Sequence, residues 1–163
     1  MKMLEIYAVK TEDNKKSQHD NAYLLLKYAL KTDCLDIKKT PSGKPYIEGG
    51  VHFNISHSHE YAVCAVADVP VGIDIELIRP VSDKLIKRFL NDCPPDEAIR
   101  EWTHRESFGK LTGEGLNNKS DIPHVFREYN DIPGYIVTVC ISRPDGLISP
   151  DAVFPEKITW YRK

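Results

Sequence analysis

The sequence predicts one α+β domain of 163 residues. Short runs of β-branched and aromatic residues, separated by glycine, proline and polar clusters, indicate strands. Three segments begin at residues that favour helix starts, namely Asp20, Ser82 and Pro94-Pro95. A chain of this length can bury about two-thirds of its unfolded surface, so it does not need disulfides or structural metals to fold.

The first part of the chain is expected to hold one helix among short strands. Met3–Val9 alternates weakly and is rich in β-formers, whereas the polar stretch 10–19 indicates a loop. Asp20 can cap a helix that continues to Leu30. Three further strands and the links between them are expected at Pro45–Ile47, Val51–Ile55 and Tyr61–Ala67, with Gly49-Gly50 and Ser56–His59 as the links.

The second part of the chain is expected to hold two helices and four strands. Val71–Glu76 alternates strictly, which is typical of a strand. Ser82 can cap a short helix, and Pro94-Pro95 opens a longer one that Gly113 or Gly115 ends. The last three strands are predicted at Val125–Tyr129, Tyr135–Ile141 and Ile158–Tyr161.

Charge and composition exclude several classes of protein. The 22 basic and 24 acidic side chains give a formal charge of −2, whereas a general nucleic-acid binder should carry a basic excess. No apolar stretch approaches the roughly 20 residues that span a bilayer, and no signal peptide is recognised. The four cysteines are scattered and form no C-x-x-C pair, which is typical of a reducing cytosol. We therefore expect a cytoplasmic protein that binds neither nucleic acid nor membrane.

Two carboxylates stand two residues apart in the strand Val71–Glu76. Side chains alternate faces along a strand, so Asp74 and Glu76 point to one face with their Cα atoms roughly 6.6 Å apart. Ile73 and Ile75 then point into the core. Paired carboxylates with open positions suit Mg²⁺, which completes its shell with water and substrate phosphates. The alternative is an edge strand with a solvated polar face.

A second group of charged residues lies on the longer predicted helix. Trp102, Glu106 and Lys110 share one stripe at four-residue spacing, and Arg105 is the next position round. A carboxylate beside two cations fits a metal–phosphate site, in which the acid binds the ion and the cations neutralise phosphate oxygens. The alternative is an ordinary surface ion pair between Glu106 and Lys110.

A third cluster of polar residues follows the strand Val51–Ile55. Ser56 and His57 can donate hydrogen bonds to an anion. A zinc site is the alternative, although no acid or thiol pair completes a ligand set. Its residues would come from His52, His57, His59 and Cys64.

These motifs occur in one order that resembles the Sfp-type 4′-phosphopantetheinyl transferases. The similarity covers about Pro41 to Leu116. The motifs are Gly43-Lys44-Pro45-Tyr46, then Phe53-Asn54-Ile55-Ser56-His57-Ser58, then Val71–Glu76, then Trp102 with Arg105-Glu106-Ser107 and Lys110. The resemblance implies a single 4′-phosphopantetheinyl transferase domain over 1–163. It would consist of two similar α+β halves, about 1–68 and 69–163, related by pseudo-twofold symmetry.

The resemblance also implies the chemistry. Mg²⁺ would be held by Asp74, Glu76 and Glu106 together with the pyrophosphate of coenzyme A. A carrier-protein serine would then attack the β-phosphorus and release 3′,5′-ADP. The implied catalytic residues are Glu106 and Lys110, with Glu106 as a possible base. The implied coenzyme A contacts are Lys44, Pro45, Ser56, His57, Arg105 and Lys110.

The implied partner is an acyl or peptidyl carrier protein, which is generally acidic around the modified serine. The family docks its carrier near the predicted helix Ser82–Leu90, although the apolar stripe of such a helix is more often core. Its apolar residues are Leu85, Ile86, Phe89 and Leu90, and its cations are Lys84, Lys87 and Arg88. Both half-motifs lie in one chain, which favours a monomer. The alternative function is a degenerate, non-catalytic module that binds coenzyme A or a carrier.

The chain departs from the family pattern at several places. Arg105 stands where the family usually has lysine, and Gly109 falls inside the predicted helix at a cost of about 1 kcal/mol relative to alanine. The N-terminal segment is shorter than in most Sfp-type enzymes. Its coenzyme A contacts have no clear match, and Lys27 and Lys15-Lys16 are the candidates.

Overall fold

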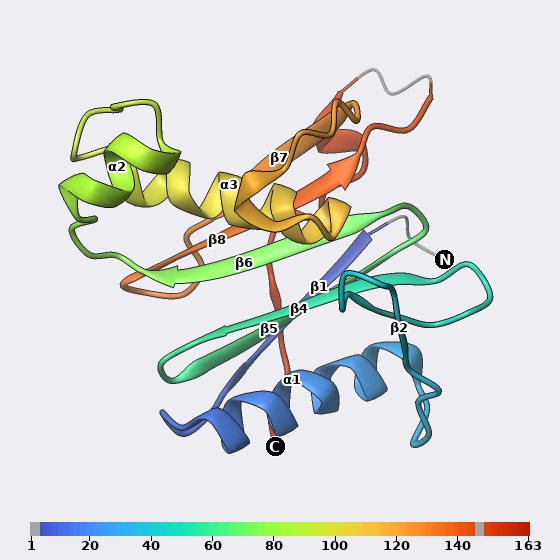
Figure 1. Cartoon of the computed structure of the whole chain (residues 1–163). Coiled ribbons are helices and arrows are strands. Elements are labelled where there is room, and N and C mark those ends of the chain that lie inside the picture. The colour runs from blue at the N-terminus through green and yellow to red at the C-terminus, as the bar shows by residue number, and fades with distance from the viewer. Residues whose placement is uncertain (1–3, 146–148) are drawn as a thin grey trace.

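The computed structural model describes residues 4–145 and 149–163 and has four layers (Figure 1). Two sheets pack face to face, the first mixed and the second antiparallel. One helix covers the outer face of the first sheet, and two helices cover the outer face of the second. The α+β class predicted from the sequence is therefore confirmed. None of the helices within the described ranges has the length and apolar character of a membrane-crossing segment.

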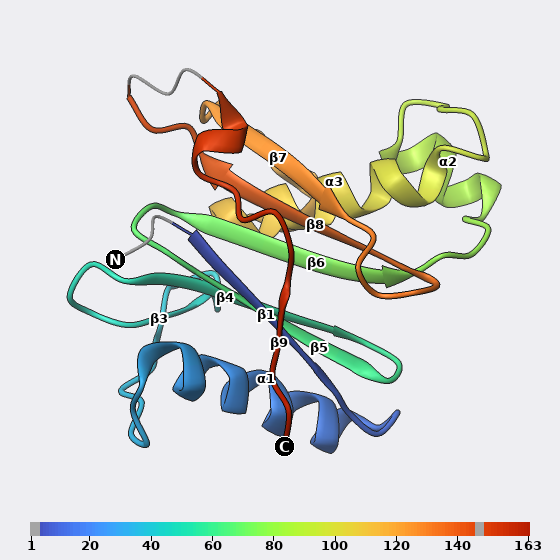
Figure 2. The ribbon, with the colours of Figure 1, turned by 180° about the vertical axis from the view of Figure 1, so that it is seen from behind.

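The first sheet is built mainly from the N-terminal part of the chain. Its strands are ordered β4-β5-β1-β9. The last of these comes from the C-terminal segment, which runs past both sheets to pair in parallel with β1 (Figure 2). The elements of this part of the structure are β1 (Leu4–Lys10), α1 (Lys15–Leu30), β2 (Lys38–Lys39), β3 (Pro45–Tyr46), β4 (His52–Ser58), β5 (Tyr61–Ala67) and β9 (Thr159–Trp160). Strands β2 and β3 pair only with each other and form a separate two-stranded sheet.

The second sheet and its helices come from the later part of the chain. Its strands are ordered β6-β8-β7, so that the last strand of the three lies in the centre. The elements are β6 (Val71–Leu77), α2 (Asp83–Phe89), α3 (Ala98–Thr112), the short 3₁₀ helix η1 (Gly115–Asn117), β7 (His124–Tyr129), β8 (Tyr135–Ser142) and the 3₁₀ helix η2 (Pro150–Ala152).

Both parts of the chain follow one connectivity. In each, a strand leads through a helical segment to an antiparallel hairpin, and the second strand of that hairpin pairs with the starting strand. The first part is β1–α1–β4–β5, with β5 between β4 and β1. The second is β6–α2–α3–β7–β8, with β8 between β7 and β6.

The main core lies between the two sheets and follows the alternation of the strands. β1 and β5 contribute one face, and β6 and β8 contribute the opposing one. Ile73 and Ile75 of β6 are buried in this core, as the alternation of Val71–Glu76 predicts. A second cluster packs α1 on the outer face of the first sheet, and a third packs α2 and α3 against the second sheet.

Strands β4 and β6 meet edge to edge through side chains, and this seam joins the two sheets. The amide N–H of Ile73 donates to Oδ1 of Asn54 at 2.8 Å, and the amide N–H of Ile75 donates to Oγ of Ser56 at 3.3 Å. Asn54 and Ser56 stand two residues apart on β4, so both point to the same side. Two backbone N–H groups at the edge of the second sheet are therefore satisfied by side chains of the first sheet.

Several element boundaries differ from the sequence prediction. The first helix begins at Lys15 instead of after Asp20, because the Asn14 side chain caps it by accepting from the Ser17 N–H at 2.9 Å. The predicted polar link 56–59 is partly strand, because β4 continues to Ser58 in register with β5. The predicted cap of α2 and end of α3 are confirmed, since Ser82 caps α2 and Gly113 ends α3 with φ 78°. The predicted start of α3 at Pro94-Pro95 is wrong: the helix begins at Ala98, because the preceding residues form a turn in which the Glu97 N–H donates to the Pro94 carbonyl at 3.0 Å.

Candidate active site

One face of β6 presents Gly72, Asp74 and Glu76 to helix α3. The glycine lets the helix backbone lie directly on the strand. A Cβ at position 72 would overlap the Ser107 carbonyl oxygen and lie 2.6 Å from the Leu111 nitrogen. Close approach of the helix therefore brings its side chains onto the two carboxylates.

The stripe Trp102, Glu106 and Lys110 of α3 faces these carboxylates, as the four-residue spacing predicts. Lys110 Nζ donates to Oδ1 of Asp74 at 2.8 Å, and the Trp102 indole N–H donates to Oε1 of Glu76 at 3.1 Å. The helix thus runs against the direction of β6, with Glu106 between its two partnered neighbours. The alternative of an isolated Glu106–Lys110 surface pair does not describe this face, because Lys110 pairs with Asp74.

Asp74 is the most enclosed carboxylate of the group, at 4% exposure. Its Oδ1 accepts from Lys110 and from the Ser56 hydroxyl, the latter at 3.3 Å. Its Oδ2 is buried and has no hydrogen-bond partner among the described residues. Burial raises the pKa of Asp74 despite the nearby ammonium of Lys110.

The other two carboxylates are half-buried and feel the same charges. Burial raises the pKa of Glu76, and the charge of Asp74 raises it further, against the indole hydrogen bond and Arg79. Burial likewise raises the pKa of Glu106, followed by the effect of Asp74. The charge of Asp74 thus disfavours ionisation of both neighbouring acids, and such an arrangement is typical of a place for a cation.

The donor set fits a hard divalent cation such as Mg²⁺. The orphaned Oδ2 of Asp74 is an oxygen ligand without a partner, and buried polar groups are normally paired. Among residues 4–145 and 149–163, no three His, Cys, Asp or Glu side chains are yet gathered at metal-binding distances. Two of the predicted ligands are turned to other partners, Asp74 to Lys110 and Glu76 to Trp102.

The predicted phosphate contacts of β4 divide between its two faces. Ser56 is 6% exposed and accepts from Lys110 Nζ at 2.9 Å, so its hydroxyl belongs to the seam beside Asp74. His57 is exposed on the other side of the strand. Burial lowers the pKa of His57, and the charges of Lys110 and His19 lower it further. His59 contacts Asp13, and Cys64 lies in the core, so the residues of the zinc alternative are not brought together.

Lys44 reaches helix α3 from the β2–β3 hairpin, whereas Pro45 pairs with Lys39 inside that hairpin. Lys44 Nζ donates to the Leu111 carbonyl at 2.7 Å and to the Val71 carbonyl at 3.4 Å. The amine therefore ties this hairpin to the C-terminal end of α3, where the helix dipole favours a cation. Burial lowers the pKa of Lys44 to about 8.

The structure places the two residues of α3 that differ from the usual family pattern, Arg105 and Gly109. Arg105 is half-buried and adjoins Glu106. Gly109 is buried where the chain after the helix folds back, and a Cβ there would lie 2.7 Å from the Gly115 carbonyl. Glycine is therefore required at this helical position by backbone packing.

Helix α2 divides its apolar stripe between core and surface. Ile86 and Leu90 are buried in the third cluster, whereas Leu85 and Phe89 are half-buried at its edge. The alternative interpretation of this stripe as core is thus right for two of the four positions. The three cations remain exposed, at Lys84, Lys87 and Arg88.

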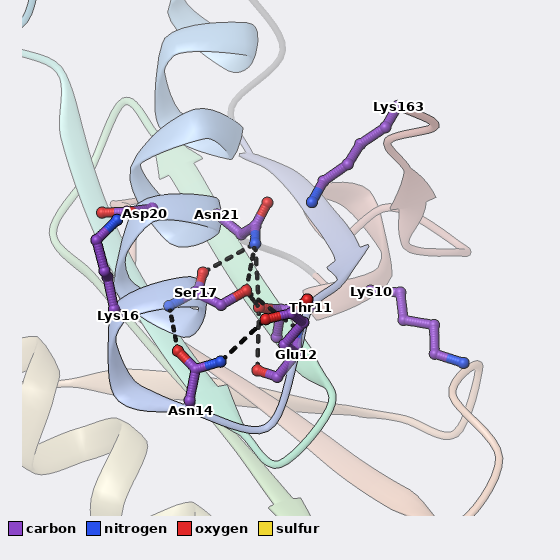
Figure 3. Close-up of a pocket in the computed structure, with 9 residues that line it drawn as sticks. All are labelled: Lys10, Thr11, Glu12, Asn14, Lys16, Ser17, Asp20, Asn21 and Lys163. Carbon is purple, nitrogen blue, oxygen red and sulfur yellow. Dashed lines mark hydrogen bonds and ion pairs between the residues drawn. The ribbon is translucent and has the colours of Figure 1, made fainter.

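A polar pocket at the start of α1 lies apart from the carboxylate face (Figure 3). Its lining includes the cationic residues Lys10, Lys16 and Lys163. It also includes Asn21 and Ser17, whose side chains are hydrogen-bonded to each other. Lys16, one of the candidate coenzyme A contacts, pairs with Asp20 at 2.9 Å. No other predicted site residue lines this pocket.

Two site contacts were missed by sequence reasoning. The role of Asn54 at the seam could have been suspected because it shares a strand face with Ser56. The bond between Trp102 and Glu76 had a weaker signal. The spacing placed the indole on the stripe of Glu106, but nothing in the sequence showed how that stripe lies along β6.

Comparison with known proteins agrees with this geometry. The 4′-phosphopantetheinyl transferase Sfp of Bacillus subtilis (strain 168) is 32% identical over 72% of this chain and 64% of its own length. The 4′-phosphopantetheinyl transferase psf-1 of Bacillus pumilus is 30% identical over 72% of this chain and 65% of its own length. HetI of Nostoc sp. (strain PCC 7120), another 4′-phosphopantetheinyl transferase, is 37% identical over 49% of this chain and 40% of its own length. No family model matches the chain.

The chain thus spans a little under two thirds of the length of Sfp and psf-1. The carboxylates of β6, the stripe of α3 and these similarities agree with one another. The chain is similar in sequence to these 4′-phosphopantetheinyl transferases over 49% to 72% of its own length.

Proposed function

We propose that this protein transfers 4′-phosphopantetheine from coenzyme A to a serine of an acyl or peptidyl carrier protein, with Mg²⁺, and releases 3′,5′-ADP. The observation that carries the proposal is the face formed by β6 and α3. This face carries three acids of raised pKa, Asp74, Glu76 and Glu106. One buried oxygen of Asp74 has no hydrogen-bond partner among the described residues, and Lys110 donates to the other. The names of the relatives support the reaction class.

In this proposal the three carboxylates Asp74, Glu76 and Glu106 hold the cation. When bound, Mg²⁺ supplies a Lewis acid that neutralises charge on the pyrophosphate as the leaving group departs. Asp74 offers its orphaned oxygen without giving up its contact with Lys110, because the two oxygens are separate. Lys110 is then placed to neutralise a phosphate oxygen beside the metal site.

The coenzyme A contacts are proposed to come from the β2–β3 hairpin, β4 and α3. Lys44, His57 and Arg105 are the cationic or polar groups that would bind its phosphates, and Pro45 would contact the adenine. Lys44 carries its charge at neutral pH, since its lowered pKa is still about 8. Ser56 would contribute to coenzyme A binding through its hydroxyl, which donates to Asp74 and accepts from Lys110.

Proton transfer is assigned to Glu106. Its carboxylate has no hydrogen-bond partner among the described residues, so it can accept a proton without breaking such a bond. It lies between Trp102 and Lys110 on the stripe. The serine oxygen forms a bond to the β-phosphorus while the bond from that phosphorus to the bridging oxygen of 3′,5′-ADP breaks. The serine proton passes to Glu106.

The carrier protein is proposed to dock on α2. The half-buried Leu85 and Phe89 offer apolar contact, and an acidic partner would be steered by the exposed cations of this short helix. We further propose that the halves 1–68 and 69–163 are related by pseudo-twofold symmetry, which their shared connectivity supports. The site would then be completed within a cytoplasmic monomer.

Intact-mass measurement tests the reaction. The protein is incubated with coenzyme A, Mg²⁺ and several apo carrier proteins, and the expected result is a carrier heavier by one phosphopantetheine. Asp74→Ala and Glu106→Ala should abolish the gain. Glu101→Ala, an exposed carboxylate of the same helix, is the matched control and should keep it. A folded protein that modifies no carrier would refute the proposal, and activity in the Asp74 variant would refute the metal site.

Charge reversal tests the docking surface separately. Lys84→Glu combined with Lys87→Glu should raise the KM for the carrier about tenfold or more while leaving the KM for coenzyme A unchanged. The matched control is Lys157→Glu with Lys163→Glu, which makes the same charge change at two exposed positions of the C-terminal segment. An equal effect of both pairs would show non-specific electrostatics instead of docking on α2.

A further inference from the structure

The indole of Trp102 holds one oxygen of a predicted metal ligand. Its N–H donates to Oε1 of Glu76 at 3.1 Å, and both side chains are half-buried between α3 and β6. The Oε2 atom of the same carboxylate is 3.8 Å from the Arg79 guanidinium, which is 46% exposed. Since a buried hydrogen bond is weakened less by water than an exposed ion pair, the indole is the firmer of the two contacts.

The indole is itself supported by helix α2. The Phe89 ring meets the Trp102 ring edge to face, with centroids 6.2 Å apart and planes at 74°. Both rings belong to the cluster around Ile86 and Leu90, so the ring of Trp102 is packed on α2 while its N–H points at β6. An edge-to-face pair of this kind favours one ring orientation.

We propose that Trp102 is a positioning residue, which orients Glu76 for the divalent cation, and that Phe89 braces it. The inference rests on the proposed function, because it assigns a role within the same site. Hydrogen-bond donors behind metal-binding carboxylates fix ligand orientation, and their loss typically lowers metal affinity or activity about 10- to 100-fold. The cation site is thereby connected through two side-chain contacts to the helix proposed to receive the carrier.

Mn²⁺ binding measured by electron paramagnetic resonance tests the role without catalysis. Titrations are run with and without coenzyme A on the full chain. Trp102→Phe keeps an aromatic ring but removes the N–H, and it should weaken Mn²⁺ binding about tenfold. Trp160→Phe, the other tryptophan of the chain and 39% exposed, is the matched control and should bind as the wild type does. Unchanged affinity in Trp102→Phe would leave Trp102 as core packing and overturn the inference.

Two further variants separate the hydrogen bond from packing. Replacing Trp102 with 3-benzothienylalanine exchanges the indole N–H for sulfur in a ring of the same shape, so it decides the question even if Trp102→Phe folds poorly. In a Glu76→Gln background, Trp102→Phe should have no additional effect on Mn²⁺ affinity, because it acts through Glu76. An equal effect in both backgrounds would overturn the inference.

Fluorescence gives a direct signal from the proposed residue. In Trp160→Phe, Trp102 is the one tryptophan left, since the sequence holds two. Added Mn²⁺ should quench its emission, and adding Phe89→Leu should lower the Mn²⁺ affinity read from that quenching. A wild type that binds Mn²⁺ in this way yet modifies no carrier would refute the proposed function alone. Absence of quenching would overturn the inference whether or not the enzyme is active.

Discussion

The ammonium group of Lys110 lies 2.8 Å from Oδ1 of Asp74, while Oδ2 of the same buried carboxylate has no hydrogen-bond partner among the described residues. The lysine also donates to Ser56 of β4 at 2.9 Å. One side chain of α3 therefore neutralises the most buried acid of β6 and contacts the neighbouring sheet. The unpartnered oxygen is the one that we propose as a ligand of the cation.

Replacing Lys110 with a neutral residue should destabilise the protein, because the buried Asp74 carboxylate would lose the positive charge that offsets its desolvation. Lys110→Met is expected to lower the free energy of unfolding by roughly 2 kcal/mol, a value reduced from that of a fully buried pair because water reaches the amine. Urea unfolding measures the change. Lys16→Met, which removes a salt bridge with both side chains more than half exposed, should leave the stability nearly unchanged, because water screens that pair.

A double-mutant cycle separates this charge effect from lost packing. Asp74→Asn removes the buried charge, so adding Lys110→Met to it should cost much less than Lys110→Met alone. The double variant should regain stability but no transfer activity. If the two changes were simply additive, the pair would not be coupled and the lysine would contribute by packing.

The glycine of β6 sets how closely α3 approaches the carboxylates. Gly72→Ala should cost at least about 2 kcal/mol of unfolding free energy, because its Cβ would overlap the Ser107 carbonyl and crowd the Leu111 nitrogen. Urea unfolding again measures the loss. Gly50→Ala provides the control: its Cβ meets open space, so its cost of about 1–2 kcal/mol comes from the positive φ alone. A loss at position 72 no greater than that at position 50 would contradict the close contact.

Much of this site follows from local periodicity. The alternation of Val71–Glu76 placed Ile73 and Ile75 in the core, and the four-residue spacing of α3 placed Trp102, Glu106 and Lys110 on one stripe. Both patterns are properties of a single element, which sequence reports directly. The same holds for Ser82, whose side chain caps α2.

Contacts between elements could not be predicted in this way. Asn54 accepts from a backbone amide of β6, and Lys44 donates to the end of α3. Each depends on how two segments distant in sequence are packed, and a polar residue gives no sign of which backbone group it will meet. The start of α1 was missed for a local reason, since Asn14 caps a first turn made of polar residues that resemble a loop.

Lys44 should make nucleotide binding depend on pH. Burial lowers its pKa to about 8, so in the free protein it loses its proton as the pH rises through that value. A bound phosphate favours the charged form, and proton uptake then accompanies binding. Affinity for 3′,5′-ADP, measured by calorimetry, should fall about tenfold between about pH 7 and about pH 9.

Two variants check that this dependence comes from Lys44. Lys44→Arg keeps its charge throughout the range, so its affinity should be nearly independent of pH. Lys44→Met should bind weakly and also without the decline. A decline of the same size in Lys44→Met would assign it to another group and contradict the proposed phosphate contact.

Glu106 should stabilise the folded protein less than glutamine, its neutral counterpart, would at the same position. Its pKa is raised by burial and by Asp74, so the folded state holds the proton more tightly than the unfolded state does. Its contribution to stability is therefore full below its unfolded pKa and is lost as the pH rises through its folded pKa. Glu106→Gln should be about 0.5–1 kcal/mol more stable than the wild type near pH 8, a small gain because water screens a half-buried carboxylate. The two proteins should match near pH 4, and the variant should transfer no phosphopantetheine. Urea unfolding at both pH values without divalent cations measures the difference, and a variant less stable near pH 8 would show that Glu106 is paired instead of repelled.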